Sequence, residues 1–216
     1  MPILLLQMTA AAQWLNNAFA AFDEAILTFA HKMHECAAGG FFDFFFPLIT
    51  RLGDGGIFFI VLSFVLIVFK KTRKVGLAMI IAIIIGSLFT NVCIKNVVAR
   101  PRPYADEASL FHQWWLEIGH GVEREFSFPS GHATVSFASM GVLLFLANKK
   151  WAAGGMILAA LIGFSRNYIY VHYPSDILGG IIVGIFSAFL ASLIVKAIYK
   201  KTADKKTKFA AWLQAD

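Results

Sequence analysis

Residues 75 to 94, VGLAMIIAIIIGSLFTNVCI, decide the class of fold, because they run for twenty positions without a formal charge. A helix needs roughly 20 apolar residues to cross the hydrocarbon core of a bilayer. Inside lipid the backbone has to satisfy its own hydrogen bonds, which favours a helix for such a segment. A second run of nineteen uncharged residues extends from Ile177 to Val195. The two runs predict a helical membrane protein.

The composition of the whole chain agrees with this prediction. Hydrophobic residues make up 58% of the 216 positions and charged residues only 15%, against about 25% charged residues in soluble domains. The two cysteines, Cys36 and Cys93, indicate no disulfide framework. No Cys/His cluster has the spacing of metal ligands, so we expect no metal site and no cofactor.

Shorter apolar segments extend the pattern on both sides of the two long runs. We predict an all-α, polytopic transmembrane helical bundle of about five core spans, with a sixth near the N-terminus left open. Ala18–His34 mixes apolar and charged residues as an amphipathic interfacial helix does. The aromatic segment Gly40–Thr50 is expected to be a second interfacial or partly inserted segment. The stretch from Val98 to Pro129 is polar and loop-like. The predicted spans are about Gly56–Phe69, Val75–Ile94, Ala133–Ala147, Trp151–Ser165 and Ile177–Val195.

Positive charge gathers in three segments that helix parity places on one side of the membrane. Lysine and arginine are enriched in cytoplasmic loops, so we expect this side to be cytoplasmic and the membrane to be the plasma membrane. Topology and attraction to anionic lipid account for the net charge of +6, and no nucleic-acid partner is expected. The residues are Lys70, Lys71, Arg73, Lys74, Lys149, Lys150, Lys196, Lys200, Lys201, Lys205, Lys206 and Lys208.

Three polar clusters fall at the opposite membrane face. Each has an ordinary explanation when taken singly, because basic residues often anchor helix ends at the interface and a serine often caps a helix. A charge beside an apolar run is nevertheless costly without a partner, which marks Lys95 and Arg166 as functional candidates. The clusters are Lys95-x6-Arg102-Pro103, Pro129-Ser130-Gly131-His132 and Ser165-Arg166-x5-His172-x3-Asp176.

The first part of the chemistry that the clusters share is anion binding. Lys95, Arg102 and Arg166 supply three cations, and guanidinium groups match phosphate oxygens well. A helix that begins at Ser130 and Gly131 adds neutral donors where a helix N-terminus favours an anion.

The second part is a nucleophile with proton transfer. His132 and His172 can divide these roles, because imidazole titrates near neutral pH. Asp176 lies four residues after His172, where it is placed to orient the ring as the third member of a triad does.

All eleven cluster residues match, in order, the three signature motifs of the type 2 phosphatidic acid phosphatase superfamily, which the chain resembles from about residue 50 to residue 198. The resemblance implies a membrane phosphatase whose partner is a lipid phosphate: undecaprenyl pyrophosphate, phosphatidylglycerophosphate or phosphatidic acid. We divide the chain into an N-terminal amphipathic segment at 1–50, a catalytic transmembrane domain at 51–201 and a cytoplasmic tail at 202–216. The substrate and the oligomeric state stay open.

The resemblance further implies a metal-independent reaction on the extracytoplasmic face of a bacterial membrane. His172 would attack phosphorus and form a phosphohistidine while Asp176 holds its ring. His132 would protonate the leaving oxygen and then activate water. Ser165 is as well explained by helix packing as by contact with phosphate. The residues that would hold the phosphoryl oxygens are Lys95, Arg102, Ser130, Gly131 and Arg166.

Other functions stay open beside this one. A lipid or sugar hydroxyl in place of water would make the protein a phosphotransferase. A lipid-phosphate transporter or binding protein would need the cations but no nucleophile, and a haloperoxidase with a similar anion pocket is not typical of a five-span chain of this size. The residues outside the motifs that we interpret as head-group contacts or solvated loop positions are Arg100, His112, His120 and Arg124.

Overall fold

The computed structural model of the chain describes residues 8–119, 121–203 and 207–214. In this part of the chain the regular structure is helical, with no β-strand, which confirms the all-α prediction. The longer helices are α1 Ala10–Glu35, α2 Gly39–Thr50, α3 Ile57–Val68, α4 Arg73–Ser87, α6 Leu110–Ile118, α7 Gly131–Leu146, α8 Lys149–Tyr168, α9 Pro174–Thr202 and α10 Lys208–Gln214. The short elements are the 3-10 turns η1 Arg51–Gly56 and η3 Pro103–Ala105, the π-helical η2 Leu88–Ile94, and α5 Lys95–Val98.

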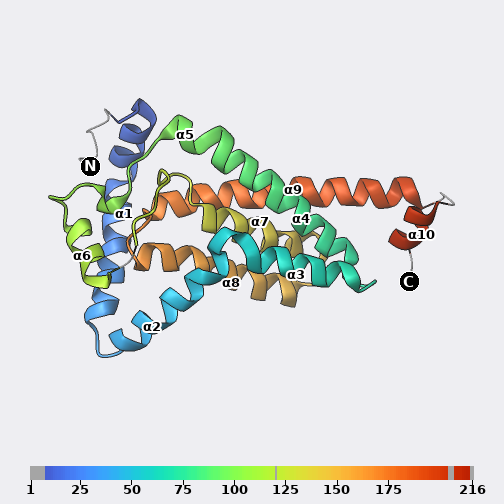
Figure 1. Cartoon of the computed structure of the whole chain (residues 1–216), viewed down its shortest axis with the longest axis horizontal. Coiled ribbons are helices and arrows are strands. Elements are labelled where there is room, and N and C mark those ends of the chain that lie inside the picture. Colours follow the sequence, from blue (N-terminus) through green and yellow to red (C-terminus); the bar gives the residue numbers. More distant parts are fainter. Residues whose placement is uncertain (1–7, 120, 204–206, 215–216) are drawn as a thin grey trace.

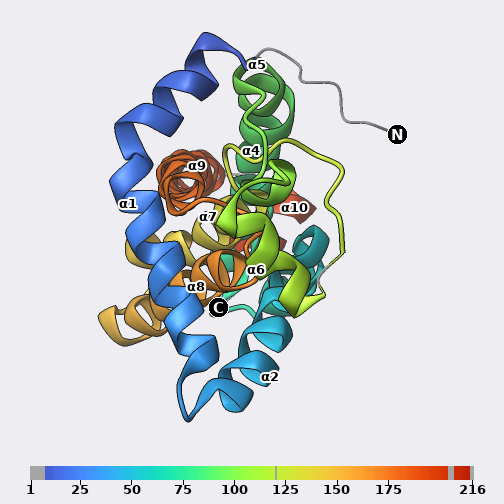
Figure 2. The same ribbon diagram turned by 90° about the vertical axis from the view of Figure 1, so that its left-hand side faces the viewer.

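α7 lies at the centre of the bundle and packs against α4, α8 and α9, with α3 beside α4. These helices run alongside one another in the direction of the long axis (Figure 1). α1 crosses one end of the bundle, where it contacts α8 and α9 (Figure 2). α6 lies at the same end. This end of the bundle is therefore covered by elements that the sequence places outside the core spans.

Small residues allow α7 and α9 to approach closely. A Cβ atom added at Gly180 would lie 2.8 Å from the carbonyl oxygen of Ser130, and one added at Gly184 would lie 2.8 Å from that of Thr134. Such backbone contact between small residues is a common way of packing helices in membranes. It fixes the start of α7 against the first turns of α9, and these two helix ends carry the second and third clusters.

Three helical stretches of the described chain are long and apolar enough to cross a membrane: Gly39–Val68, Arg73–Ala105 and Pro174–Thr202. Gly131–Leu146 is a shorter apolar helix. These stretches support a multi-pass membrane protein, and the number of five core spans stays a prediction. The segment Gly40–Thr50, which we expected to be interfacial or partly inserted, forms the first part of the candidate span Gly39–Val68, in agreement with the second alternative.

A kink separates α2 from α3 at the glycine-rich segment of residues 52–56. Asp54 has an extended ψ of 117°, and Gly55 and Gly56 have φ angles of 56° and 69°. Glycine adopts such positive φ angles without the steric cost that a Cβ atom brings. Because η1 packs against α7, the kink brings Asp54 next to the beginning of that helix.

The interpretation of residues 98–129 as a loop is wrong in its middle part, which forms α6. The hydroxyl of Ser109 caps this helix by accepting from the N–H of His112, and Gly119 ends it with a φ of 67°. One face packs through aromatic rings: Trp114 stacks on His31 at 4.2 Å between ring centroids, and Trp115 stacks on Tyr104 at 4.5 Å. The apolar positions whose spacing is typical of a helix are Leu110, Phe111, Trp114, Trp115 and Ile118.

The lysine-rich connection between α3 and α4 and the C-terminal helix α10 lie at the end of the bundle opposite α1 and α6 (Figure 1). This arrangement agrees with the predicted separation of a basic side from the side that carries the clusters. Lys205 and Lys206, which belong to the predicted basic group, lie outside the described residues.

Candidate active site

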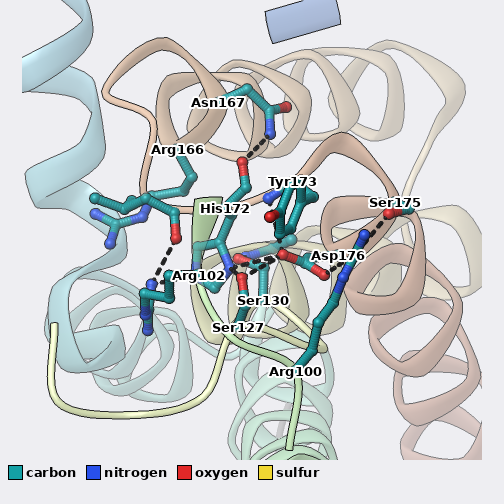
Figure 3. Close-up of polar contacts among 12 residues, drawn as sticks. Arg100, Arg102, Ser127, Ser130, Arg166, Asn167, His172, Tyr173, Ser175 and Asp176 are labelled. Atoms are coloured by element: carbon teal, nitrogen blue, oxygen red, sulfur yellow. Dashed lines mark hydrogen bonds and ion pairs between the residues drawn. The ribbon is translucent and has the colours of Figure 1, made fainter. Parts of the chain in front are cut away.

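Members of the three clusters, among them Arg102, Ser130 and His172, lie close together (Figure 3). Lys95 begins α5, Ser130 caps α7, and Arg166 lies in the last turn of α8. His172 lies in the connection between α8 and α9, and Asp176 lies in the first turn of α9. Helix ends that are far apart in the sequence thus supply one polar group of side chains.

The imidazole of His172 is buried and is contacted on both ring nitrogens. Its Nδ1 lies 3.5 Å from a carboxylate oxygen of Asp176 and 3.4 Å from the hydroxyl oxygen of Ser127. Its Nε2 lies 3.3 Å from Nη1 of Arg102. The side-chain amide of Asn167 donates to the backbone carbonyl of His172 at 2.9 Å. The ring therefore turns Nδ1 toward the acid and Nε2 toward the cation.

The carboxylate of Asp176 is fully buried and accepts three hydrogen bonds. Its Oδ2 accepts from the hydroxyl of Ser127 and, at 2.8 Å, from the backbone N–H of Tyr173. Its Oδ1 accepts from Nη1 of Arg100 at 2.7 Å. Since a buried carboxylate needs such partners to offset the loss of water, these donors fix Asp176 beside the ring of His172.

Arg102 and Lys95 form the cationic wall on one side of His172. The guanidinium of Arg102 donates to the backbone carbonyls of Glu125 and Val171, both at 2.8 Å. Lys95 is 5% exposed, and its ammonium contacts the carboxylate of Glu125. These two backbone hydrogen bonds fix the position of the Arg102 guanidinium.

Arg166 is the third cation and is not fully satisfied. Its Nη1 donates to the hydroxyl of Thr50 at 2.9 Å, and its Nη2 contacts the carboxylate of Glu123. Its Nε–H is buried and has no hydrogen-bond partner among the described residues. A buried donor without an acceptor costs about 1–3 kcal/mol. Such a group is suited to donate a hydrogen bond to an oxygen atom of a bound anion.

Two glutamates from the segment before α7 neutralise the cations. Glu123 pairs with Arg166, and Glu125 pairs with Lys95. Burial opposes ionisation of Glu123, but the positive charges of Arg166 and Arg102 outweigh it and lower the pKa of this carboxyl. A phosphate group that binds to these cations has to compete with the two carboxylates.

His132 lies in the first turn of α7 and pairs with an acid that the motifs do not contain. Its Nε2 is 2.9 Å from Oδ1 of Asp54. The ring packs so close to Gly53 that a Cβ atom there would lie 2.4 Å from its Cδ2. A Cβ atom at Gly131 would meet nothing within 4 Å, so there is open space on the Cβ side of this residue.

The remaining sequence candidates divide into structural and solvated residues. The hydroxyl of Ser165 donates to the carbonyl of Ile162 at 2.7 Å, which supports helix packing as its role. His112 lies 2.6 Å from the carbonyl of Tyr104, so it holds α6 in place. Arg124 is exposed. His120 lies outside the described residues.

The interpretation of Arg100 as a head-group contact or a solvated residue is wrong. Its side chain is 1% exposed and bonds to Asp176 and to Asp23 of α1. A charge this deeply buried needs ionic partners, and these come from segments 76 and 77 residues away. No local sequence pattern announces such a pair.

Sequence reasoning also missed five other residues that contact the predicted site. Their signals were weak, because each looks like an ordinary cap, turn or loop residue when taken alone. An acid within a glycine-rich turn beside a span was the best available hint, and it applies to Asp54. The residues are Thr50, Asp54, Glu123, Glu125 and Ser127.

The electrostatic surroundings of His172 favour a neutral ring. Burial, followed by the positive charges of Arg102 and Arg166, lowers the pKa of His172 well below its usual value. A neutral imidazole keeps a lone pair on one ring nitrogen, which a nucleophile or a base requires. Within the described part of the chain, no three His, Cys, Asp or Glu side chains are grouped so as to hold a metal ion.

Comparison with known proteins identifies the family. The family model described as the PAP2 superfamily matches residues 71–200, which are more than half of the chain. The chain therefore belongs to the PAP2 superfamily, as the motif resemblance predicted.

Relatives and solved structures agree with this assignment. Phosphatidylglycerophosphatase B of Bacillus subtilis is 31% identical over 208 residues, which cover 87% of this chain and 90% of that protein. An undecaprenyl-diphosphatase of Sulfolobus acidocaldarius is 33% identical over 127 residues, which span only 58% of either protein. The crystal structure of a transmembrane PAP2 type phosphatidylglycerolphosphate phosphatase from Bacillus subtilis superposes with a TM-score of 0.64 at 28% identity, covering 92% of this chain and 93% of that one. The expectation of a lipid phosphatase is thereby confirmed at the level of the family.

Proposed function

We propose that this protein hydrolyses lipid phosphates or pyrophosphates through a covalent phosphohistidine formed on His172. The observation that carries the proposal is the setting of this ring. Nδ1 faces the buried carboxylate of Asp176, while Nε2 faces Arg102 at 3.3 Å. In a ring held in this way, Nδ1 is stabilised by the carboxylate and Nε2 is placed to react with phosphorus.

In the first step Nε2 of neutral His172 forms a bond to phosphorus, and the bond between phosphorus and the lipid-side oxygen breaks. His132 donates a proton to the departing oxygen, and Asp54 supports the protonated form of its ring. The lowered pKa of His172 means that its lone pair is available without prior loss of a proton.

In the second step water attacks phosphorus, His132 takes up the proton, and the bond from Nε2 to phosphorus breaks. Free phosphate and neutral His172 result. Asp176 stabilises the positive charge that the ring carries while it holds the phosphoryl group. Pre-organised donors stabilise the phosphoryl oxygens in both transition states. These donors are Lys95, Arg102, Arg166, Ser130 and the N–H of Gly131.

The substrate class follows from the membrane setting and from the relatives. Their names point to undecaprenyl diphosphate and to phosphatidylglycerophosphate, and phosphatidic acid carries the same monoester group. We propose that such a lipid is the substrate. Transfer to a lipid or sugar hydroxyl, and transport without chemistry, are the alternative outcomes of the test.

Phosphate release by the purified protein tests the proposal directly. The wild type is offered each of the three lipids, with and without EDTA, beside the His172→Ala variant. His112→Ala is the matched control, because this histidine lies on α6 outside the three clusters, where its ring contacts the backbone carbonyl of Tyr104 and the ring of Trp115. We expect release in EDTA from at least one lipid, none with His172→Ala, and unchanged release with His112→Ala. Near-normal release by folded His172→Ala would remove the nucleophile from the account.

We further propose that the site faces away from the cytoplasm across the plasma membrane. The support is the position of the lysine-rich connection between α3 and α4 at the opposite end of the bundle (Figure 1). Single cysteines at Glu107 and at Lys149 test this topology in a background that lacks Cys36 and Cys93. In intact cells an impermeant thiol reagent should label the first position and not the second. The reverse labelling would overturn the topology.

A further inference from the structure

A buried ionic cluster joins α1 to Asp176 of the site, and two of its members, Arg100 and Asp23, have no role in the proposed reaction. Its centre is Arg100, which lies between two carboxylates. Nη1 of Arg100 donates to Asp176 at 2.7 Å, and Nη2 donates to Asp23 at 2.8 Å. All three side chains are buried, with relative exposures of 1%, 0% and 3% for Arg100, Asp176 and Asp23. Asp23 belongs to α1, which lies outside the region matched by the family model.

The guanidinium of Arg100 is fixed in orientation by further contacts. Its Nε donates to the side-chain oxygen of Asn16 at 2.8 Å, and Nη1 also donates to the hydroxyl of Ser175 at 2.7 Å. Its Cζ lies 3.9 Å from the centre of the Tyr173 ring, a cation–π arrangement. With donors on all three nitrogens engaged, the group can hold Asp176 in one position.

Asp23 is held as tightly as Arg100. Its Oδ1 accepts from the backbone N–H of Ser175 at 2.8 Å, and its Oδ2 accepts from the hydroxyl of Ser175 at 2.7 Å. Ser175 directly precedes Asp176 at the start of α9. The carboxylate of Asp23 therefore fixes both the guanidinium of Arg100 and the backbone at Ser175.

The charges of the cluster explain why one arginine meets two acids. A pair of Arg100 with Asp176 alone would be neutral, and the positive charge of Arg100 would offset the attraction of Asp176 for a positively charged His172. Asp23 supplies a second negative charge to the same guanidinium, so the three groups together carry one net negative charge. That charge faces a histidine which becomes positive when it carries the phosphoryl group. The other titratable groups that face the cluster are Tyr173 and Arg102.

We propose that Arg100 and Asp23 are positioning residues of the reaction, which hold Asp176 beside His172 and preserve its negative charge for the phosphorylated ring. The proposal rests on the phosphohistidine reaction above. It makes α1 a part of the active site, although the helix contributes no motif residue. A displacement of about 1 Å in a catalytic group can cost about 100-fold in rate, so loss of either residue should have a large kinetic effect.

The test measures kcat, KM and the pH dependence of kcat for Asp23→Asn, Arg100→Gln and Arg100→Lys. Arg73→Gln is the control, because Arg73 is a buried arginine at the other end of the bundle that donates to the backbone carbonyls of Ile67 and Trp212. We expect Asp23→Asn to lower kcat about 10- to 100-fold with KM within threefold. Arg100→Gln leaves two close carboxylates without their cation, so its acid limb should move to higher pH. Arg100→Lys should restore part of kcat, and Arg73→Gln should leave the pH profile unchanged.

A double-mutant cycle separates positioning from general damage to the fold. If Asp23 acts through Asp176, then Asp23→Asn should cost less than threefold in a background that already carries Asp176→Asn. An equal loss in both backgrounds, or wild-type kcat in folded Asp23→Asn, would overturn the proposal. Failure of the reaction itself would show differently, since His172→Ala would then retain activity whatever the behaviour of Asp23→Asn.

Discussion

Substitution of Gly53 by alanine should slow the reaction without removing any functional group. A Cβ atom at this position would lie 2.4 Å from Cδ2 of His132 and 3.0 Å from Cγ of the same ring. Carbon atoms normally keep about 3.5–4.0 Å apart, so the ring has to move by about 1 Å. That movement breaks its 2.9 Å contact with Asp54. We expect kcat to fall about 100-fold, with KM nearly unchanged.

The assay is steady-state phosphate release, with thermal unfolding measured in parallel. Overpacking of this kind costs typically about 1–3 kcal/mol of stability, so the variant should still fold at low temperature. Gly154→Ala is the matched control, because a Cβ atom at that position on α8 meets nothing within 4 Å. A folded Gly53→Ala variant that keeps more than half of the wild-type kcat would refute the role assigned to His132.

Two further predictions concern the charges around the phosphate position. Glu125→Gln should strengthen inhibition by inorganic phosphate or vanadate by about 1.5- to 5-fold, the range expected from an ion pair of about 0.2–1 kcal/mol whose carboxylate is exposed. Glu107→Gln in the exposed loop should have no effect. Unchanged inhibition in Glu125→Gln would mean that this carboxylate does not compete with the ligand. Since the pKa of His172 is lowered, the neutral form persists as pH falls, and kcat/KM corrected for substrate ionisation should drop less than twofold between pH 7.5 and about pH 6, where a histidine of ordinary pKa would be about three-quarters protonated. A fourfold drop would show that the pKa of the nucleophile is not lowered.

The sequence was sufficient to predict the motif residues as one site, for a simple geometric reason. Each cluster lies at the end of an apolar run, and helix ends on one side of a bilayer lie near one another. The structure brings Arg102, His172 and Asp176 into contact as expected. The contact between His172 and Asp176 that their spacing predicts is present in the structure. The two residues do not share a helix, because His172 precedes α9 and Asp176 lies in its first turn.

The partners of these residues could not be predicted, because they depend on long-range packing. The sequence pattern places Asp23 on the polar face of an amphipathic segment. Only the packing of α1 against the bundle buries it to 3% exposure. Its partner Arg100 lies 77 residues further along the chain. Glu123 likewise has the sequence pattern of a solvated loop residue, but in the structure it pairs with Arg166. Burial, and not residue type, turns such side chains into members of the site.

The central claim is that phosphate is carried by His172, and trapping of the phosphorylated protein tests it most directly. The wild type and the variants His132→Ala and His172→Ala are mixed rapidly with a lipid substrate labelled at its terminal phosphate and then denatured in alkali. The account predicts protein-bound label that is stable to base and labile to acid. It should accumulate further in His132→Ala if water activation is slowed more than attack, and it should be absent in His172→Ala. Turnover by the wild type with no trapped label in the wild type or in His132→Ala would contradict the account. Label that remains in His172→Ala would contradict it as well.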